Sequence, residues 1–398
     1  MKTSYYDYPK LYKQYAKKRL VAGLKKRDYP LIPLSFNDTI IQVGYGYKQR
    51  RVWCTDYNQI SGFGLAKDKE VTNDFLNNGN IPAPVSIPVA NEKEFKEALL
   101  KIDFPLVLKP AKGTHGGKGV KVNILSKAEA MAAFKEVMEL TETIIVENYL
   151  EGDDHRVLVI NYEAVAVLQR IPANVKGDGK STVKELIETE NERRENLPHE
   201  QKASLLPIPM DQTTGETLKK IKMSYDSIPE QNQMVKLRFN SNVCTGGETV
   251  GVTDKIHPEN KKLCEKAARL MGLKIAGVDV ISTDISKPMN ANDAKIIEVN
   301  TRPGIIMHTV PGSGEPIDTV SIFVDKVFPK PEDMWIPITL SGQKVKNSSE
   351  VKKHLANEPK SIQRYRRPDS REIEIVNNPT DQLVTYLMDP LTVAVEIF

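Results

Sequence analysis

Hydrophobic positions along the chain change their spacing several times, and these changes predict alternating strands and helices. Residues 275–281 are apolar and mostly β-branched apart from Gly277 and Asp279, which predicts a buried strand carrying one carboxylate. Residues 295–299 predict a second such strand, reached through the turn-rich segment 290–293. Acidic side chains within or beside apolar strands are costly unless a cation compensates their charge.

The same patterns predict further elements on both sides of this pair. Short apolar runs predict strands, and helical spacing after a capping residue predicts helices. The polar region 196–233 is predicted to be irregular. The predicted strands are 40–43, 104–109, 120–124, 164–170 and 336–340, and the predicted helices begin at Asp68, Asn91, Ser126, Thr182 and Pro258. The alternating segments 372–376, 383–387 and 391–398 are compatible with a small β-containing appendage or with a dimer contact.

Composition limits the class of protein. The 398 residues suffice for two or three domains, and 40% hydrophobic with 27% charged residues is ordinary for a globular protein. A net charge of +4 is small for this length and predicts no nucleic-acid partner. The three cysteines lack metal-ligand or disulfide spacing. Apolar runs are too short to span a membrane, and the basic stretch from Lys10 to Arg27 is interpreted as a solvated helix face, so we expect a cytoplasmic protein without a membrane partner.

Three oxygen-bearing side chains are candidates for a metal site. Glu298 and Asn300 are two residues apart, so on a strand they leave the same face. Together with Asp279 on the neighbouring strand, they offer the hard oxygen donors that Mg²⁺ favours when water and nucleotide phosphates complete its shell. The alternative is that both acids lie at strand ends and are capped by backbone amides.

Two lysines and a glycine-rich loop are candidates for binding phosphate. Lys69 lies in the first turn of a predicted helix, where the helix dipole disfavours a cation and an anionic ligand would compensate it. Lys109 ends a predicted strand, and the loop 111–120 after it contains four glycines. That loop joins strand to strand, which excludes Walker A and Rossmann motifs. A phosphate lid is the functional interpretation; a plain hairpin and a surface lysine are the alternatives.

Further candidates lie at the ends of other strands. The segment from Glu147 to Leu150 follows an apolar strand, and its backbone could contact an adenine edge. Arg156 begins the next strand, and Arg238 opens a segment in which it alternates with two asparagines on one predicted strand face, through residue 242. We interpret His308, near the presumed metal end, as a hydrogen-bonded structural histidine.

Taken in order, these motifs resemble the ATP-grasp superfamily of carboxylate–amine ligases. The resemblance rests on LKP with a glycine-rich hairpin, VENYL, HR, AGVD and EVN. Within the superfamily, QVGYGYKQRR, RIPANVKGDGKSTVKELIE and TGGETVGVTDKIHPEN are similar to the ATP-grasp portion of the cyanophycin synthetase family. Fused glutathione synthetases share PANVKGDGK and TGG. The resemblance covers roughly residues 30–329.

The resemblance implies an α+β ATP-grasp fold, in which two α+β subdomains grip ATP. We expect a shortened N-terminal region (1–62), a central lid subdomain (63–147), a C-terminal ATP-grasp subdomain with the metal site (148–329) and a small C-terminal appendage (330–398). The implied nucleotide-binding residues are Lys69, Lys109, Gly113, His115, Gly116, Gly117, Gly119, Glu147, Asn148, Tyr149 and Leu150. Asp279, Glu298 and Asn300 are implied to hold two Mg²⁺ ions, and Arg238 and Arg156 to stabilise the transferring phosphoryl group.

The implied activity is ATP-dependent amide-bond formation between an amino-acid or peptide carboxylate and an amino-acid amine, through an acyl phosphate. Cyanophycin synthetases continue into a Mur-type ligase module with a P-loop, whereas the region after Pro329 contains no GxxxxGK[ST] and is interpreted as a degenerate remnant of that module's start. The alternatives are a glutathione-synthetase-like or other dipeptide ligase, and a catalytically inactive nucleotide-binding scaffold. The family also leads us to expect a homo-oligomer.

Overall fold

A computed structural model of the chain describes residues 8–33, 41–45, 48–52, 57–111, 119–198, 200–334, 338–340, 343–345, 363–366, 372–375 and 394–397. The chain divides into two compact units, each described here by itself. Unit 1 comprises Met1–Leu11 and Tyr57–Ile322, and unit 2 comprises Tyr12–Asp56 and Phe323–Phe398. Within the described ranges, every helix is too short or too polar to span a lipid bilayer.

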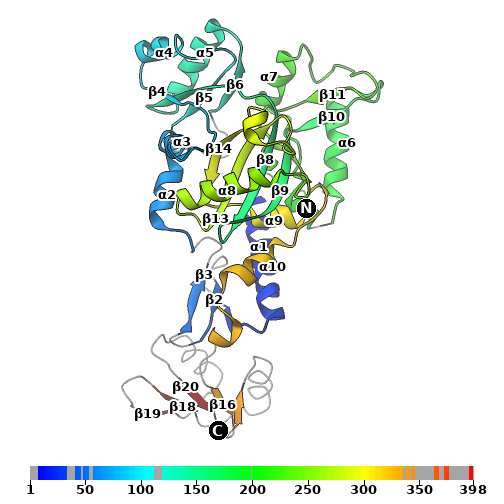
Figure 1. Ribbon diagram of the computed structural model, residues 1–398. Helices are drawn as coiled ribbons and strands as arrows, with labels where there is room; N and C mark the ends of the chain where they lie inside the picture. Colours follow the sequence, from blue (N-terminus) through cyan, green and yellow to red (C-terminus); the bar gives the residue numbers. More distant parts are fainter. Residues whose placement is uncertain are drawn as a thin grey trace. The chain divides into compact units, whose positions relative to one another are not determined.

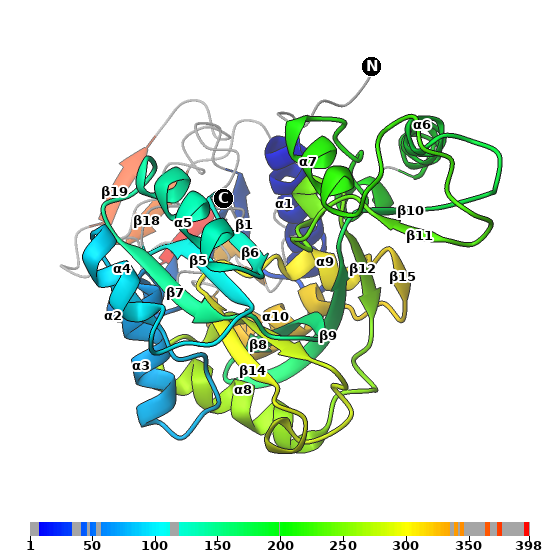
Figure 2. The same ribbon diagram turned by 90° about the horizontal axis from the view of Figure 1, so that it is seen from above.

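A six-stranded sheet forms the centre of unit 1 (Figures 1 and 2). Its neighbours pair antiparallel except at one edge, where β12 and β15 are parallel. The strands predicted at 275–281 and 295–299 are confirmed as β13 and β14, which are hydrogen-bonded neighbours. In spatial order the strands are β14 (Lys295–Asn300), β13 (Ile275–Ser282), β8 (Asp153–Ile160), β9 (Glu163–Ile171), β12 (Glu248–Gly251) and β15 (Ser313–Gly314).

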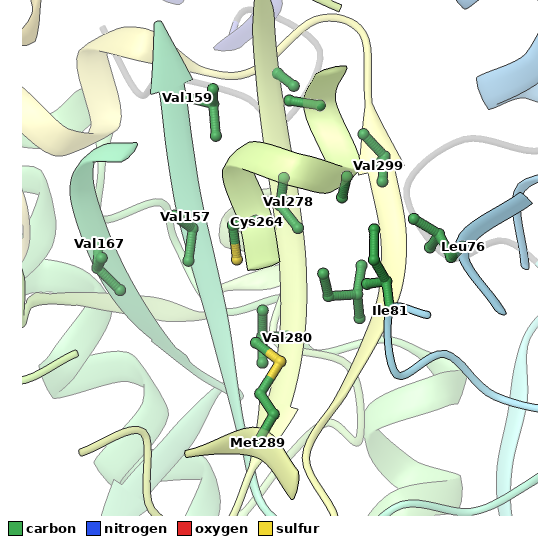
Figure 3. Packing of buried hydrophobic residues seen from close by; sticks show 14 of the residues in the cluster. Leu76, Ile81, Val157, Val159, Val167, Cys264, Val278, Val280, Met289 and Val299 are labelled. Atoms are coloured by element: carbon green, nitrogen blue, oxygen red, sulfur yellow. The ribbon is translucent and has the colours of Figure 1, made fainter. Parts of the chain in front are cut away.

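One face of this sheet is apolar and packs against helix α8 (Pro258–Leu270), as Figure 3 shows. Val157 on β8 and Val278 on β13 are opposite each other in register and both are fully buried. The buried side of α8 consists of small residues such as Cys264 and Ala267, which let the helix approach the sheet closely. Because side chains alternate along a strand, the residues next to these valines leave the opposite face.

A smaller antiparallel sheet with two helices has its own core in unit 1. Phe95 and Phe134 stack there with ring centroids 4.5 Å apart. The predicted strand–loop–strand hairpin is confirmed by the pairing of β5 with β6, whereas Gly113, His115, Gly116 and Gly117 lie outside the described residues. The sheet order is β4 (Ile87–Val89), β7 (Ile144–Asn148), β5 (Leu106–Pro110), β6 (Lys121–Ile124), and the helices are α4 (Glu92–Ala98) and α5 (Lys127–Met138).

Two further helices of unit 1 are α2 (Ile60–Lys67) and α3 (Lys69–Asn78). The side chain of Asp68 caps α3 by accepting a hydrogen bond from the Val71 backbone N–H. This confirms the predicted helix start and places Lys69 at the first position of the helix, followed by Glu70 in the same turn.

Residues 172–247, between β9 and β12, form an insert with a separate apolar core. Two predictions for this region are wrong. The region 196–233 contains a helix, α7, whose start is capped by Asp211. No strand runs from Arg238 to Asn242, because β11 ends at Lys236 and the Asn242 side chain caps a 3₁₀ turn. The elements are β10 (Asn174–Lys176), α6 (Val183–Glu195), η2 (Gln201–Ala203), α7 (Gln212–Lys220), β11 (Met234–Lys236) and η3 (Val243–Thr245).

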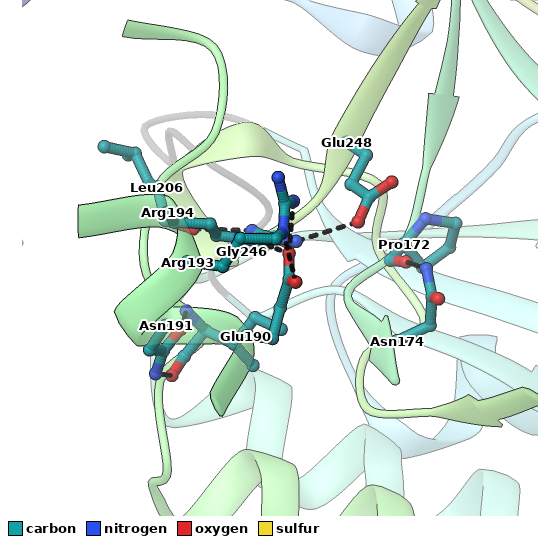
Figure 4. Close-up of polar contacts among 10 residues, drawn as sticks. Pro172, Asn174, Glu190, Asn191, Arg193, Arg194, Leu206, Gly246 and Glu248 are labelled. Atoms are coloured by element: carbon teal, nitrogen blue, oxygen red, sulfur yellow. Dashed lines mark hydrogen bonds and ion pairs between the residues drawn. The ribbon is translucent and has the colours of Figure 1, made fainter. Parts of the chain in front are cut away.

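Hydrogen bonds of the Arg194 side chain connect α6 to the end of the insert (Figure 4). Its side chain is 1% exposed and donates to the Leu206 carbonyl at 2.6 Å and the Gly246 carbonyl at 2.9 Å. It also donates to the carboxylates of Glu190 and Glu248, at 2.7 and 2.9 Å. A buried guanidinium with its donors used in this way ties the helix to the strand that returns to the main sheet.

Unit 2 combines segments from both ends of the chain. Arg27 pairs with Asp325 at 2.6 Å, and the rings of Tyr29 and Phe328 meet edge to face. The alternating segments 372–376 and 391–398 contain the strands β19 and β20, and 383–387 lies outside the described residues. The strands are β1 (Leu31–Pro33), β2 (Ile41–Val43), β3 (Arg50–Val52), β16 (Ile338–Leu340), β17 (Gln343–Val345), β18 (Gln363–Arg366), β19 (Glu372–Ile375) and β20 (Ala394–Ile397), and helices α1 (Tyr8–Lys26) and α10 (Thr319–Val327) reach into this unit.

Candidate functional site

The charged face of the six-stranded sheet lies opposite the apolar core and has Asp279 at its centre. In the strand register, Asp279 is opposite Arg156 on β8 and Glu298 on β14. Arg156 donates from Nε and Nη2 to the two carboxylate oxygens of Asp279, and Nη2 of Arg170 lies 3.0 Å from Oδ2. Arg156 is 8% exposed and Asp279 is 2% exposed. Two guanidinium groups therefore neutralise one almost inaccessible carboxylate.

Electrostatics keep Asp279 ionised despite its burial. Burial by itself raises the pKa of the Asp279 carboxyl, but the charges of Arg156 and Arg170 outweigh that effect, so the pKa is lowered. Arg170 also donates to Asp154 at 2.6 Å, so it links two carboxylates. The charged face is thus a network of alternating charges.

The predicted metal residues are brought together on this face. Asp279 and Glu298 are directly opposite each other, and the Asn300 side-chain amide donates to Asp279 Oδ2 at 3.2 Å. Within the part of the chain that the structure describes, no three His, Cys, Asp or Glu side chains are grouped to hold a metal ion. The predicted donor set has two carboxylates and one amide, which suits an ion whose shell water and phosphates complete. Such an ion would share Asp279 with Arg156 and Arg170.

The two predicted phosphate-binding lysines also lie near each other. Lys109 is 8% exposed, and its Nζ is 2.7 Å from Glu147 Oε2. The pKa of Lys69 is lowered, first by burial, and the charges of Glu298 and Lys109 act on it in opposite directions. The charges of Lys109 and of Glu298 on the charged face therefore both act on Lys69.

The segment predicted to line adenine has several backbone and side-chain groups engaged. Glu147 is 4% exposed and accepts hydrogen bonds from Asn73 at 2.9 Å and Ser86 at 2.5 Å. The Asn148 side-chain amide donates to the Asp103 carbonyl at 3.0 Å, and the Tyr149 backbone N–H donates to the Pro105 carbonyl at 2.8 Å. Contacts of these residues and of Leu150 with a nucleotide stay a prediction.

Arg238 lies in the insert, where it donates to Asp211 Oδ2 at 2.6 Å. Its side chain is almost fully buried and its Nε has no hydrogen-bond partner among the described residues. Within those residues it forms no hydrogen bond or ion pair with Arg156 or Asp279. The structure therefore separates the two predicted catalytic arginines into different polar networks.

The interpretation of His308 is wrong in one respect. This residue of α9 (Ile305–Thr309) is 1% exposed, yet neither ring nitrogen has a hydrogen-bond partner among the described residues. Burial, together with the charges of Arg156 and Arg170, lowers the pKa of its imidazole to about 3. His308 is thus a neutral imidazole beside two guanidinium groups.

Sequence reasoning missed four residues that contact the predicted ones: Asn73, Ser86, Arg170 and Asp211. Arg170 carried a usable signal, because it is a charged residue that follows the apolar run 164–168 in a predicted strand. Asn73 lies four residues after Lys69, on the same side of α3. Ser86 and Asp211 lie in loops, and nothing in their local sequence indicates their partners.

Comparisons with known proteins find ATP-grasp domains in two parts of the chain. A family model described as phosphoribosylglycinamide synthetase, ATP-grasp (A) domain, matches residues 67–173, and a RimK-like ATP-grasp domain matches residues 231–312. A cyanophycin synthetase of Nostoc sp. is 38% identical over 322 residues, covering 80% of this chain and 35% of that protein. A glutathione biosynthesis bifunctional protein of Clostridium perfringens is 34% identical, covering 63% of this chain and 32% of that protein.

A solved structure gives a comparison at the level of the fold. The bifunctional glutathione synthetase from Pasteurella multocida is 26% identical, with a TM-score of 0.57, and the match covers 78% of this chain and 43% of that one. The chain spans about a third of the length of the curated relatives that it matches. The predicted α+β ATP-grasp fold is confirmed by these matches.

Proposed function

We propose that this chain, which has the ATP-grasp fold, is an ATP-dependent carboxylate–amine ligase acting on amino acids or short peptides. A substrate carboxylate attacks the γ-phosphate of ATP, giving an acyl phosphate and ADP. An amine then attacks the acyl carbon, releasing phosphate and forming the amide. The observation that carries the proposal is the pairing of Asp279 with Glu298 on a sheet face that also holds two arginines.

The residues of this chain supply positioning and charge neutralisation, which phosphoryl transfer needs more than a protein nucleophile. Lys69 and Lys109 bind nucleotide phosphates. Arg156 stabilises negative charge on the transferring group from the charged face. Arg238 does the same from the insert.

Asp279, Glu298 and Asn300 are proposed to hold Mg²⁺, two ions in the fully loaded state. The ions supply neutralisation of the β- and γ-phosphates. Asn300 keeps Asp279 in place through its amide N–H, which leaves the Asn300 carbonyl oxygen as the third donor. Arg156 and Arg170 hold the Asp279 carboxylate ionised, the form that binds a cation.

A second candidate is a ligase of the glutathione-synthetase type, favoured by the match to the Clostridium protein and the Pasteurella fold. The two candidates differ in their substrates: the first joins amino acids or aspartate–arginine peptides, and the second joins γ-glutamylcysteine to glycine. We also propose a homo-oligomer and a cytoplasmic location, where ATP is supplied. Light scattering of the purified protein tests the first of these.

The test is phosphate release with Mg-ATP against single amino acids, amino-acid pairs, aspartate–arginine peptides, and γ-glutamylcysteine with glycine. Mass spectrometry of the products should show an ATP-dependent loss of water for one pair. Glu298→Gln is a better inactive control than Asp279→Ala, because Asp279 neutralises two buried arginines and its loss threatens folding. Nucleotide binding without phosphate release for any pair would instead establish the scaffold alternative.

A further inference from the structure

Glu147 is held by residues from three other segments of unit 1. Its Oε2 lies 2.7 Å from Lys109 Nζ on β5. Its Oε1 accepts one hydrogen bond from Asn73 on α3, at 2.9 Å, and one from the hydroxyl of Ser86, at 2.5 Å. Asn73 also donates to Ser86 Oγ at 2.6 Å. Three side chains from separate segments thus converge on one carboxylate.

The two carboxylate oxygens of Glu147 have different partners. Two neutral donors hold Oε1, so Oε2 is directed at the ammonium group of Lys109. A carboxylate that is 4% exposed is costly to bury unless it is fully hydrogen-bonded, and this one has three donors. Rotation of the Glu147 carboxylate is therefore restricted, and this fixes the position of the Lys109 ammonium group that pairs with it.

The same group of residues also reaches the second lysine. Asn73 is one helical turn after Lys69 on α3, so the two side chains leave the same side of the helix. The pKa of Lys69 is lowered by burial; among the charges acting on it, Lys109 lowers it further and Glu147 raises it. Glu147 therefore offsets the repulsion between two ammonium groups that both need to be charged to bind phosphate.

We propose that Ser86 and Asn73 are positioning residues, which fix the Glu147 carboxylate so that it holds Lys109 at the right place for a nucleotide phosphate. The proposal rests on the proposed function, in which Lys109 binds ATP. It gives Glu147 a role different from lining adenine. Positioning matters because small displacements of binding groups cost phosphoryl-transfer enzymes large factors in rate.

The test uses Ser86→Ala, Ser86→Thr, Glu147→Gln and the double variant Ser86→Ala/Glu147→Gln. Isothermal titration with Mg-ADP should show affinity weakened about tenfold in Ser86→Ala, the typical effect of losing a hydrogen bond to a charged group. Ser86→Thr keeps the hydroxyl and should remain within about twofold of the wild type. The double variant should be no weaker than Glu147→Gln alone, because Ser86 acts through Glu147.

Ser126→Ala is the matched control, since Ser126 caps α5 with a 3.3 Å hydrogen bond to a backbone N–H. It should lower the melting temperature while leaving Mg-ADP affinity unchanged. Equal affinity losses in Ser126→Ala and Ser86→Ala, or additive losses in the double variant, would overturn the proposal in favour of a general effect on folding.

A second readout does not require nucleotide. Trace acetylation with acetic anhydride, followed by peptide mass spectrometry, reports how available the Lys109 amine is. Lys109 should react faster in Ser86→Ala than in Ser86→Thr or the wild type; equal rates would overturn the proposal. A different result would contradict the proposed ligase function: the wild-type protein would bind Mg-ADP but release no phosphate with any substrate pair.

Discussion

Arg156 and Asp279 lie opposite each other on neighbouring strands and form an ion pair from which solvent is almost excluded. The carboxylate is also bound by Arg170, and it lies directly opposite Glu298. One aspartate therefore serves the stability of the sheet and, in the proposed function, the binding of Mg²⁺. Glu298 is proposed only to bind Mg²⁺, so mutation of one or the other residue can separate metal binding from the stability of the sheet.

Asp279→Asn should destabilise the protein, because it leaves two buried guanidinium groups with less counter-charge. Breaking a buried ion pair by removing one partner typically costs about 3–5 kcal/mol. Urea denaturation should show a loss of that size. Glu298→Gln, the matched control, should change the free energy of unfolding by less than about 1 kcal/mol and still abolish Mg²⁺-dependent tightening of ADP binding. Equal destabilisation by both variants would contradict the separation of duties.

As the pH rises, the affinity for ADP should begin to fall at a lower pH than it would if Lys69 had the pKa of an ordinary lysine. Burial lowers the pKa of Lys69, so its ammonium group loses its proton, and its attraction for phosphate, earlier as the pH rises. Titrations of Mg-ADP between about pH 7 and pH 10 would locate the decline. Lys69→Arg is the control, since a guanidinium stays charged over this range and should remove the decline. A wild-type affinity that is flat to pH 10 would be the contrary result.

His308 should make the protein sensitive to acid. Its pKa of about 3 in the folded state lies below the ordinary value of 6.5, so the unfolded chain binds a proton that the folded chain excludes. The contribution to stability is present above pH 6.5 and is lost as the pH falls from 6.5 toward 3, at up to about 1.4 kcal/mol per pH unit.

His308→Asn isolates this effect, because asparagine does not titrate and Asp279 and His155 are unchanged in both proteins. The difference in unfolding free energy between the wild type and the variant should shift in favour of the variant as the pH falls from about 6.5 to 4.5. A difference that is independent of pH would show that the imidazole is protonated, or finds a partner, in the folded protein.

The sequence predicted the elements that carry the site better than the contacts within it. Strand alternation was sufficient to place Glu298 and Asn300 on one face beside Asp279, because that pattern is local. The partnership of Asp279 with Arg170 depends on β8 and β9 being the next strands in the sheet, which is not encoded near either residue. Helix α7 was missed because Gly215 and its threonines are weak helix formers, so its Asp211 cap and the burial of Leu218 decide its structure.

Arg194 should be essential for the stability of the insert, and its neighbour Arg193 should not. Both contact Glu190, but the Arg193 side chain is 53% exposed, whereas Arg194 is 1% exposed and also binds two carbonyls and Glu248 (Figure 4). Arg194→Met removes the donors of two buried carbonyls and of the partly exposed carboxylates of Glu190 and Glu248, at a cost of about 3–5 kcal/mol, while Arg193→Met should cost at most about 1 kcal/mol.

Hydrogen exchange locates the damage. In Arg194→Met, protection should fall in α6 and in residues 205–248, while β13 and β14 keep theirs, because the insert has its own apolar core. If Arg238 acts on substrate from the insert, this variant should also lose phosphate release under conditions in which Mg-ADP still binds normally. Uniform loss of protection across unit 1 would instead show that the insert and the main sheet unfold as one cooperative body.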